Sequence, residues 1–171
     1  MIQKILLGIL MVALSATAAT SQTRKRTAGA AAPKSAAAKE LRTGAERITA
    51  EAKILATFLY RYGAVAEGVR LSEKSAKENN APPEVLAMIQ KNKVAVADTV
   101  RNLVGGMQDL ERYLGLSPST KPYFNVVNGL SQDIDLAADT AAAGNLDAAA
   151  EQLLTVLDNL NGALLPPAPP N

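Results

Sequence analysis

Residues 41–69 read LRTGAERITAEAKILATFLYRYGAVAEGV and carry the clearest helical pattern of the chain. Apolar residues recur there in alternating steps of four and three positions, which places them on one face of a long α-helix. The same period is typical of helices that pack side by side. Ile54, Phe58 and Val65 widen this face, so we expect the helix to contact more than one neighbour. The members of the main stripe are Leu41, Ala45, Ile48, Ala52, Leu55, Leu59, Tyr62, Ala66 and Val69.

Three further amphipathic segments follow this helix. The second helix is expected over residues 83–114, with one polar residue, Lys93, in an apolar stripe that otherwise consists of Leu86, Ile89, Val96, Val100, Leu103, Met107, Leu110 and Leu114. We expect this lysine to pack its aliphatic stem on the stripe and to extend its ammonium group to water. The third and fourth helices are expected over residues 123–141 and 146–164. The stripe of the third consists of Tyr123, Val127, Leu130, Ile134, Ala137 and Ala141, and that of the fourth consists of Leu146, Ala150, Leu153, Leu157, Leu160 and Leu164.

Short turn signals separate these segments. Asparagine and proline follow the first helix at positions 79–83, Gly-Leu-Ser-Pro follows the second at 115–118, and Gly144 precedes the fourth. Amphipathic helices with short connections pack most simply as antiparallel neighbours. The sequence therefore predicts an all-α fold, an antiparallel up-down-up-down four-helix bundle built from two long helices and a shorter helical hairpin.

The first turn also sets a rough register between the two long helices. It brings Phe58 near Val104, with Gly105 and Gly106 beside it, so that a large side chain would lie against small residues. The alternative interpretation is that the two glycines loosen the second helix at its middle, because glycine is a poor helix former.

The two ends of the chain differ from the bundle in composition. Residues 1–18 combine an early lysine, an apolar run of about ten residues and an Ala-Thr-Ala sequence, which is typical of a cleavable signal peptide. Residues 19–35 are basic and alanine-rich, so we expect a disordered linker before a bundle over 36–164. Residues 165–171 predict an extended, proline-rich tail. We expect an exported protein, periplasmic or secreted, that is soluble after signal cleavage.

The composition excludes several kinds of chemistry. The chain contains no histidine and no cysteine, so it lacks an imidazole for acid–base catalysis and a thiol nucleophile. It also lacks the side chains that usually hold zinc, haem iron or iron–sulfur clusters. No phosphate-binding glycine loop and no dinucleotide fingerprint is present. We therefore expect no enzyme activity, no catalytic residue, and no cofactor or metal site.

Carboxylates are the remaining candidates for chemistry. Asp135 and Asp139 share a helix face, while Asp133 points elsewhere, and a calcium loop would need a non-helical backbone and a turn glycine. We expect a solvated face there rather than a metal site. A glycan-cleaving enzyme would need two acids in a cleft, which a narrow bundle rarely supplies. The acids whose replacement would test that hypothesis are Glu46, Glu51 and Glu111.

Charge is unevenly distributed along the chain. Residues 19–116 hold 16 Lys and Arg against 10 Asp and Glu, whereas residues 117–171 hold one lysine and six acids. The two halves are expected to attract each other on folding, and the alternative is that one charged face recruits a partner. The whole chain has a net charge of +2, so we expect no nucleic-acid partner.

Two groups of residues are candidates for contact with a partner. Tyrosine and arginine are favoured as interface anchors, and the alternative for these residues is packing within the bundle or a solvated rim. The basic cluster of the linker is a candidate for weak contact with an anionic envelope surface, or a solvated arm. The interface candidates are Tyr60, Arg61, Arg112 and Tyr113, and the surface candidates are Arg24, Lys25 and Arg26.

These observations favour a binding protein over an enzyme. The leading hypothesis is an exported, non-enzymatic helical bundle of the cell envelope that associates with a protein partner or with itself. The alternative is a carrier of a small apolar ligand, with its site between the first and second helices around Phe58, Gly105 and Gly106.

Overall fold

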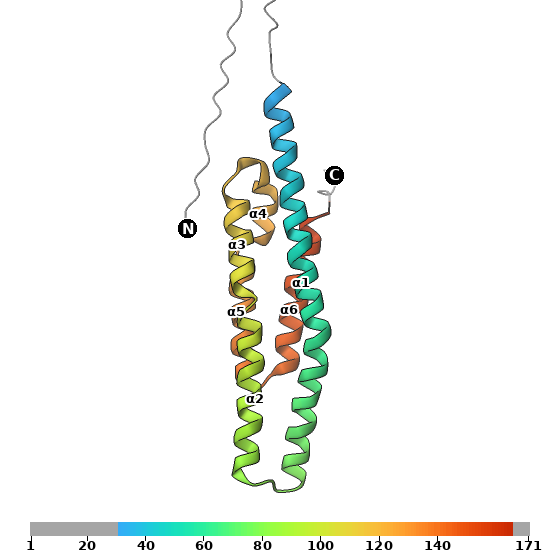
Figure 1. The fold of residues 1–171 in the computed structure, drawn as a ribbon, viewed down its shortest axis with the longest axis vertical. Helices are drawn as coiled ribbons and strands as arrows, with labels where there is room; N and C mark the ends of the chain where they lie inside the picture. The colour runs from blue at the N-terminus through green and yellow to red at the C-terminus, as the bar shows by residue number, and fades with distance from the viewer. Residues whose placement is uncertain (1–30, 166–171) are drawn as a thin grey trace, which may run out of the picture.

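The computed structural model describes the backbone of residues 31–165 and the side chains of residues 35–165, and this part of the chain is helical with no β-strand (Figure 1). The long α1 is followed by α2 and α3, then by the short 3-10 helix η1, and last by α4, α5 and α6. Their bounds are α1 Ala31–Glu78, α2 Pro83–Arg101, α3 Val104–Gly115, η1 Pro118–Thr120, α4 Lys121–Val127, α5 Leu130–Ala142 and α6 Leu146–Ala163.

The helices form an antiparallel four-helix bundle (Figure 1). The first rod of the bundle is α1, the second consists of α2 and α3, the third consists of α4 and α5, and the fourth is α6. The second rod packs on α1 and α5, and α6 packs on α1 and α5, so that the four rods close around one core. The predicted up-down-up-down bundle is confirmed.

The second and third predicted helices are each interrupted once. Between α2 and α3, the Leu103 N–H bonds to the Val100 carbonyl at 3.0 Å, a tighter step than the α-helical one. This break lies just before Gly105 and Gly106, where helix propensity is lowest. The third helix is split at Gly129, whose φ of +99° is a left-handed conformation that glycine adopts readily.

The first helix begins earlier than expected. It begins at Ala31, inside the 19–35 segment that the sequence assigned to a linker. Alanine is the best helix former, and Pro33 is tolerated because the first turn needs no donor there. The helix continues without a break through Gly63 and Gly68, and a Cβ atom at either glycine would meet nothing within 4 Å.

Gly44 is the glycine of α1 at which another element approaches closely. A Cβ atom there would lie 3.1 Å from the ring of Tyr123, 3.2 Å from Thr120 and 3.3 Å from Leu114. The hydroxyl of the buried Thr120 donates a hydrogen bond of 2.7 Å to the Leu114 carbonyl. Gly44 therefore lets the η1–α4 corner pack directly on α1.

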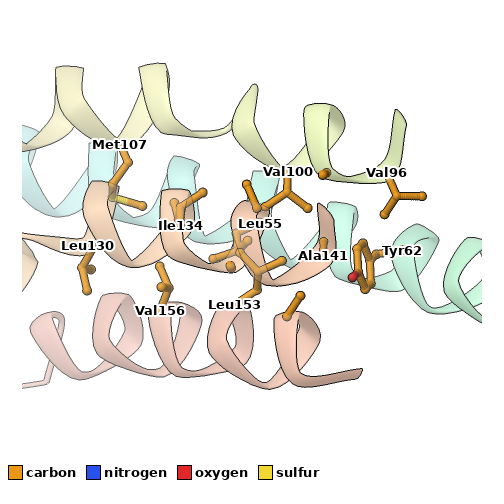
Figure 2. Close-up of a cluster of buried hydrophobic side chains, with 14 of the residues drawn as sticks. Leu55, Tyr62, Val96, Val100, Met107, Leu130, Ile134, Ala141, Leu153 and Val156 are labelled. Carbon is orange, nitrogen blue, oxygen red and sulfur yellow. The ribbon is translucent and has the colours of Figure 1, made fainter. Parts of the chain in front are cut away.

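All four rods contribute side chains to the core (Figure 2). Leu55 of α1, Val100 of α2, Ile134 of α5 and Leu153 of α6 are buried and lie close together in the figure, with Met107 of α3 beside them. The predicted stripes supply most of this core. Positions that the stripes left out are also fully buried, among them Ala149 and Val156 of α6.

The predicted widening of the first stripe is wrong at two positions. Ile54 and Val65 are 52% and 51% exposed, because no helix of the described chain covers that side of α1. Leu86 of the second stripe is also exposed. It lies near the tip of the α1–α2 hairpin, which extends past the α5–α6 turn, so no third helix reaches it (Figure 1).

Candidate binding groove

The outer side of the α1–α2 pair carries an apolar groove of about 350 Å³. The groove exists because α1 and α2 pack on the α5–α6 side of the bundle, whereas no described helix lies over their other side. It opens between the predicted widening residues of α1 and the C-terminal half of α2. The lining residues are Ile54, Thr57, Phe58, Arg61, Tyr62, Val65, Val96, Thr99 and Leu103.

A second hollow of about 470 Å³ continues this groove toward the hairpin tip. The two share Val65, Val96 and Thr99, so they form one channel along the helix pair. The second hollow has more polar and smaller lining residues, including Ser72 and Asn92. The channel is therefore apolar at its bundle end and polar toward the hairpin tip.

The hydroxyl groups of the groove donate their hydrogens to the protein itself. Thr57 and Thr99 each donate a 2.8 Å hydrogen bond to a carbonyl four residues earlier in the helix. The Tyr62 hydroxyl donates to the Leu146 carbonyl at 2.9 Å, which ties α1 to the start of α6. Burial, and secondarily the nearby charge of Asp147, raises the pKa of Tyr62 to about 12. Tyr62 therefore stays neutral and structural at physiological pH.

One of the four predicted contact residues, Arg61, lies at this groove. Arg61 lines it and makes no ion pair or hydrogen bond with the side chains and backbone described over residues 35–165. Tyr60 is next to it in α1 and is 86% exposed. Both residue types are favoured at interfaces, but Tyr60 does not line the groove, because consecutive residues of a helix point about 100° apart.

The other two predicted contact residues are used differently. Arg112 is exposed and pairs with Asp109 at 2.8 Å, while Tyr113 is half-buried under the guanidinium of Arg47, 4.0 Å from its ring centroid. Tyr60 follows Arg47 by 13 residues, or about 20 Å along α1. The two predicted pairs are therefore not parts of one site. Arg24, Lys25 and Arg26 lie outside the described residues.

The predicted pairing of Phe58 with the two glycines is not what the structure has. Phe58 lines the groove with Leu103, one position before the expected Val104. A Cβ atom at Gly106 would lie 3.1 Å from the carboxylate of Glu51, and one at Gly105 would meet nothing within 4 Å. Phe58 is thus within about one residue of the predicted register, but Gly106 faces Glu51 rather than Phe58, and Gly105 faces no neighbour.

The three acids considered for catalysis each interact with other residues of the bundle. Glu111 accepts hydrogen bonds from the backbone N–H groups of Gly129 and Ser131 at 3.1 and 2.8 Å and from the Ser131 hydroxyl at 2.9 Å. It thus caps the start of α5 from a neighbouring helix. Glu46 pairs with Arg42 on the surface. Burial, followed by repulsion from Asp109, raises the pKa of Glu51.

The aspartates of α5 pair with the second rod. Arg101 of α2 lies 2.6 Å from Asp139 and 3.3 Å from Asp135, so it bridges two acids one helical turn apart. These charge-assisted bonds raise the pKa of Arg101, with the Asp135 bond as the largest cause. Within residues 35–165, no group of three acids is placed to hold a metal ion. The attraction expected between the two oppositely charged halves is present in this pair.

Lys93 extends to a carboxylate rather than to open water. Its ammonium group lies 2.8 Å from Glu73, its side chain is only 12% exposed, and a Cβ atom at Gly144 in the α5–α6 turn would lie 3.0 Å from its Nζ. Hydrogen bonds from Lys93 and then Lys77 lower the pKa of Glu73. The predicted snorkelling is wrong because Glu73 stands directly opposite, a pairing across helices that the stripe of one helix does not reveal.

Comparison with protein-family models, with curated proteins and with solved structures found no match. Among the helices of the described chain, none combines the length and the apolar character that crossing a bilayer requires.

Proposed function

We propose that this chain is an exported, non-enzymatic binding protein of the cell envelope that associates with another protein or with a second copy of itself. The α1–α2 face, defined by Ile54, Arg61 and Val65, is the proposed contact surface. Tyr60, which is exposed on another side of α1, is a separate candidate for contact. The single observation that supports the proposal is the exposure of the apolar side chains Ile54 and Val65 along an uncovered groove. Exposed apolar surface of this kind is typical of interaction sites.

The chemical inventory supports binding rather than catalysis. Glu51 lies against Gly106, Glu111 caps the start of α5, and Glu46 pairs with Arg42 on the surface. These acids therefore do not form the two-carboxylate cleft of a glycan-cleaving enzyme. The export part of the proposal rests on residues 1–18, whose composition is that of a signal peptide. N-terminal sequencing of the protein isolated from its own envelope fraction and medium tests that part, and an intact Met1 would contradict it.

Light scattering after size exclusion tests the association. We expect a dimer, a larger species or a retained protein partner, and we expect the double variant Ile54→Ser and Val65→Ser to weaken it by about tenfold or more, since buried apolar side chains dominate interfaces. The matched control is Leu154→Ser, an equally exposed leucine on α6. A monomer over a wide range of concentrations, without a partner that depends on Ile54 and Val65, would contradict the proposal.

The groove also supports a second candidate function, the transport of a small apolar ligand. Its volume of about 350 Å³ lies in the range of small-molecule sites, and most of its lining is apolar. Native mass spectrometry of the protein purified without detergent tests this candidate. A bound small molecule that the Val65→Asp variant loses would support it, and an empty protein that binds no apolar probe would contradict it.

A further inference from the structure

The charge of the groove is set by one residue. Arg61 is the only charged side chain among the nine residues that line it, and no carboxylate lines it. Other arginines of the bundle are committed to acids of their own chain: Arg70 to Glu67 at 2.7 Å and Arg101 to Asp139 at 2.6 Å. Arg61 has no such partner in the described residues. The groove therefore offers a cation that the protein leaves uncompensated.

Arg61 is also the source of hydrogen-bond donors in the groove. The hydroxyls of Thr57, Thr99 and Tyr62 already donate to backbone carbonyls. A guanidinium presents a fork of N–H groups that matches the two oxygens of a carboxylate. A phosphate monoester carries additional charge and acceptor oxygens, for which this groove has no further donors. The donor set therefore favours a carboxylate head.

The remaining lining matches a hydrocarbon tail. Phe58 and Leu103 are partly buried, and Ile54 and Val65 are half-exposed walls. The positions from Ile54 to Val65 cover about 16 Å of α1, which gives an elongated rather than a round site. An aliphatic chain laid along this length would remove apolar surface of both partners from water.

We infer that the α1–α2 groove binds a single-chain amphiphile with a carboxylate head, whose tail lies against Ile54, Phe58, Val65 and Leu103 and whose head pairs with Arg61. This inference rests on the second candidate function and names its ligand class. The head is exposed to solvent at one side, so Arg61 contributes selectivity for the anionic head while the tail supplies most of the affinity.

Three probes with the same tail separate the contributions of head and tail: dodecanoate, 1-dodecanol and dodecyltrimethylammonium. Isothermal titration of the full chain, below the micelle concentration of each probe, gives their affinities. We expect one dodecanoate per chain, bound about fivefold tighter than dodecanol and more tightly still than the cationic probe. Shortening the acid should weaken binding by about two- to fourfold per methylene.

Two variants assign the two parts of the site. Arg61→Gln should remove the preference for dodecanoate and leave dodecanol binding unchanged, whereas Arg112→Gln, at an exposed arginine of α3, should change neither. Val65→Ser should weaken dodecanoate and dodecanol alike, with Leu71→Ser as the control on the same helix. Ile54, Val65 and Leu71 are all about half exposed, so these serine variants should fold normally.

The outcomes are distinguishable. If dodecanol binds as tightly as dodecanoate, or if Arg61→Gln leaves the preference intact, the carboxylate head is not recognised and the inference fails, while the apolar carrier remains. If no probe binds, both the inference and the carrier fail. Association measured by light scattering is independent of these titrations, so the leading proposal is judged separately.

Discussion

The two sides of α1 carry similar apolar residues with opposite environments. Leu55 on the inner side is 3% exposed and packs in the core, whereas Ile54, its neighbour in the chain, is more than half exposed at the groove. The inner side is covered by α3 and α6, and the outer side by no described helix. The difference shows that hydrophobicity alone does not place a residue in a core. What decides its burial is whether a second helix is available to cover it.

The largest expected effect comes from deleting a core side chain on the covered side. Leu153→Ala should lower the free energy of unfolding by about 2–5 kcal/mol, because the leucine is fully buried between the rods and its loss leaves a cavity. Ile54→Ala, on the open side, should change it by less than about 0.5 kcal/mol. Urea unfolding followed by circular dichroism measures both. Equal losses would mean that the open side is covered in solution.

Two glycines of α1 also test the difference between a covered and an open side of the helix. Gly44→Leu should destabilise the protein by about 1–3 kcal/mol, because Tyr123, Thr120 and Leu114 leave no room for a larger side chain. Gly63→Leu should stabilise it by about 0.5–1 kcal/mol, because leucine is the better helix former and nothing lies within 4 Å. Thermal unfolding of the two variants measures the contrast. A destabilising Gly63→Leu would show a neighbour on the open side.

This comparison explains why the sequence predicts the fold better than it predicts the residues of the candidate site. The four apolar stripes predict the bundle because helical periodicity is a local property, and residues such as Ile48, Val100 and Ile134 are buried as expected. The break before Gly105 agrees with the alternative interpretation that the two glycines loosen the second helix. The Lys93–Glu73 pair depends on which helix lies opposite, which no single stripe records. The sequence placed a ligand site around Phe58, Gly105 and Gly106. Phe58 lines the groove, whereas the two glycines do not, because the lining depends on how α1 and α2 pack against each other.

Polar side chains show the same difference between the covered and the open side of the bundle, with smaller effects on stability. Glu111→Ala should cost about 1–2 kcal/mol of unfolding free energy, because it removes the cap of α5 and leaves the N–H groups of Gly129 and Ser131 without their acceptor. Arg61→Ala, at the groove, should cost about 0.5 kcal/mol or less, since the guanidinium has no partner in the described chain. Glu111→Gln, which keeps one acceptor oxygen, should recover part of the loss. Chemical unfolding of the three variants tests this order.

The smallest expected effect concerns Glu51, which lies half-buried over Gly106. Burial first, and the charge of Asp109 second, raise the pKa of this carboxyl above its usual 4.5. The folded protein then binds the proton more tightly than the unfolded chain, so Glu51 makes stability fall as the pH rises from about 4.5 through the raised pKa.

Glu51→Gln should therefore be slightly more stable than the parent at pH 7. This advantage should disappear below about pH 4.5, where Glu51 of the parent is protonated in both the folded and the unfolded chain. Unfolding curves of parent and variant between pH 4 and pH 8 measure the difference, and Glu46→Gln, at an exposed surface pair, is the control. An advantage that grew on acidification would reverse the sign and place Glu51 beside a cation instead.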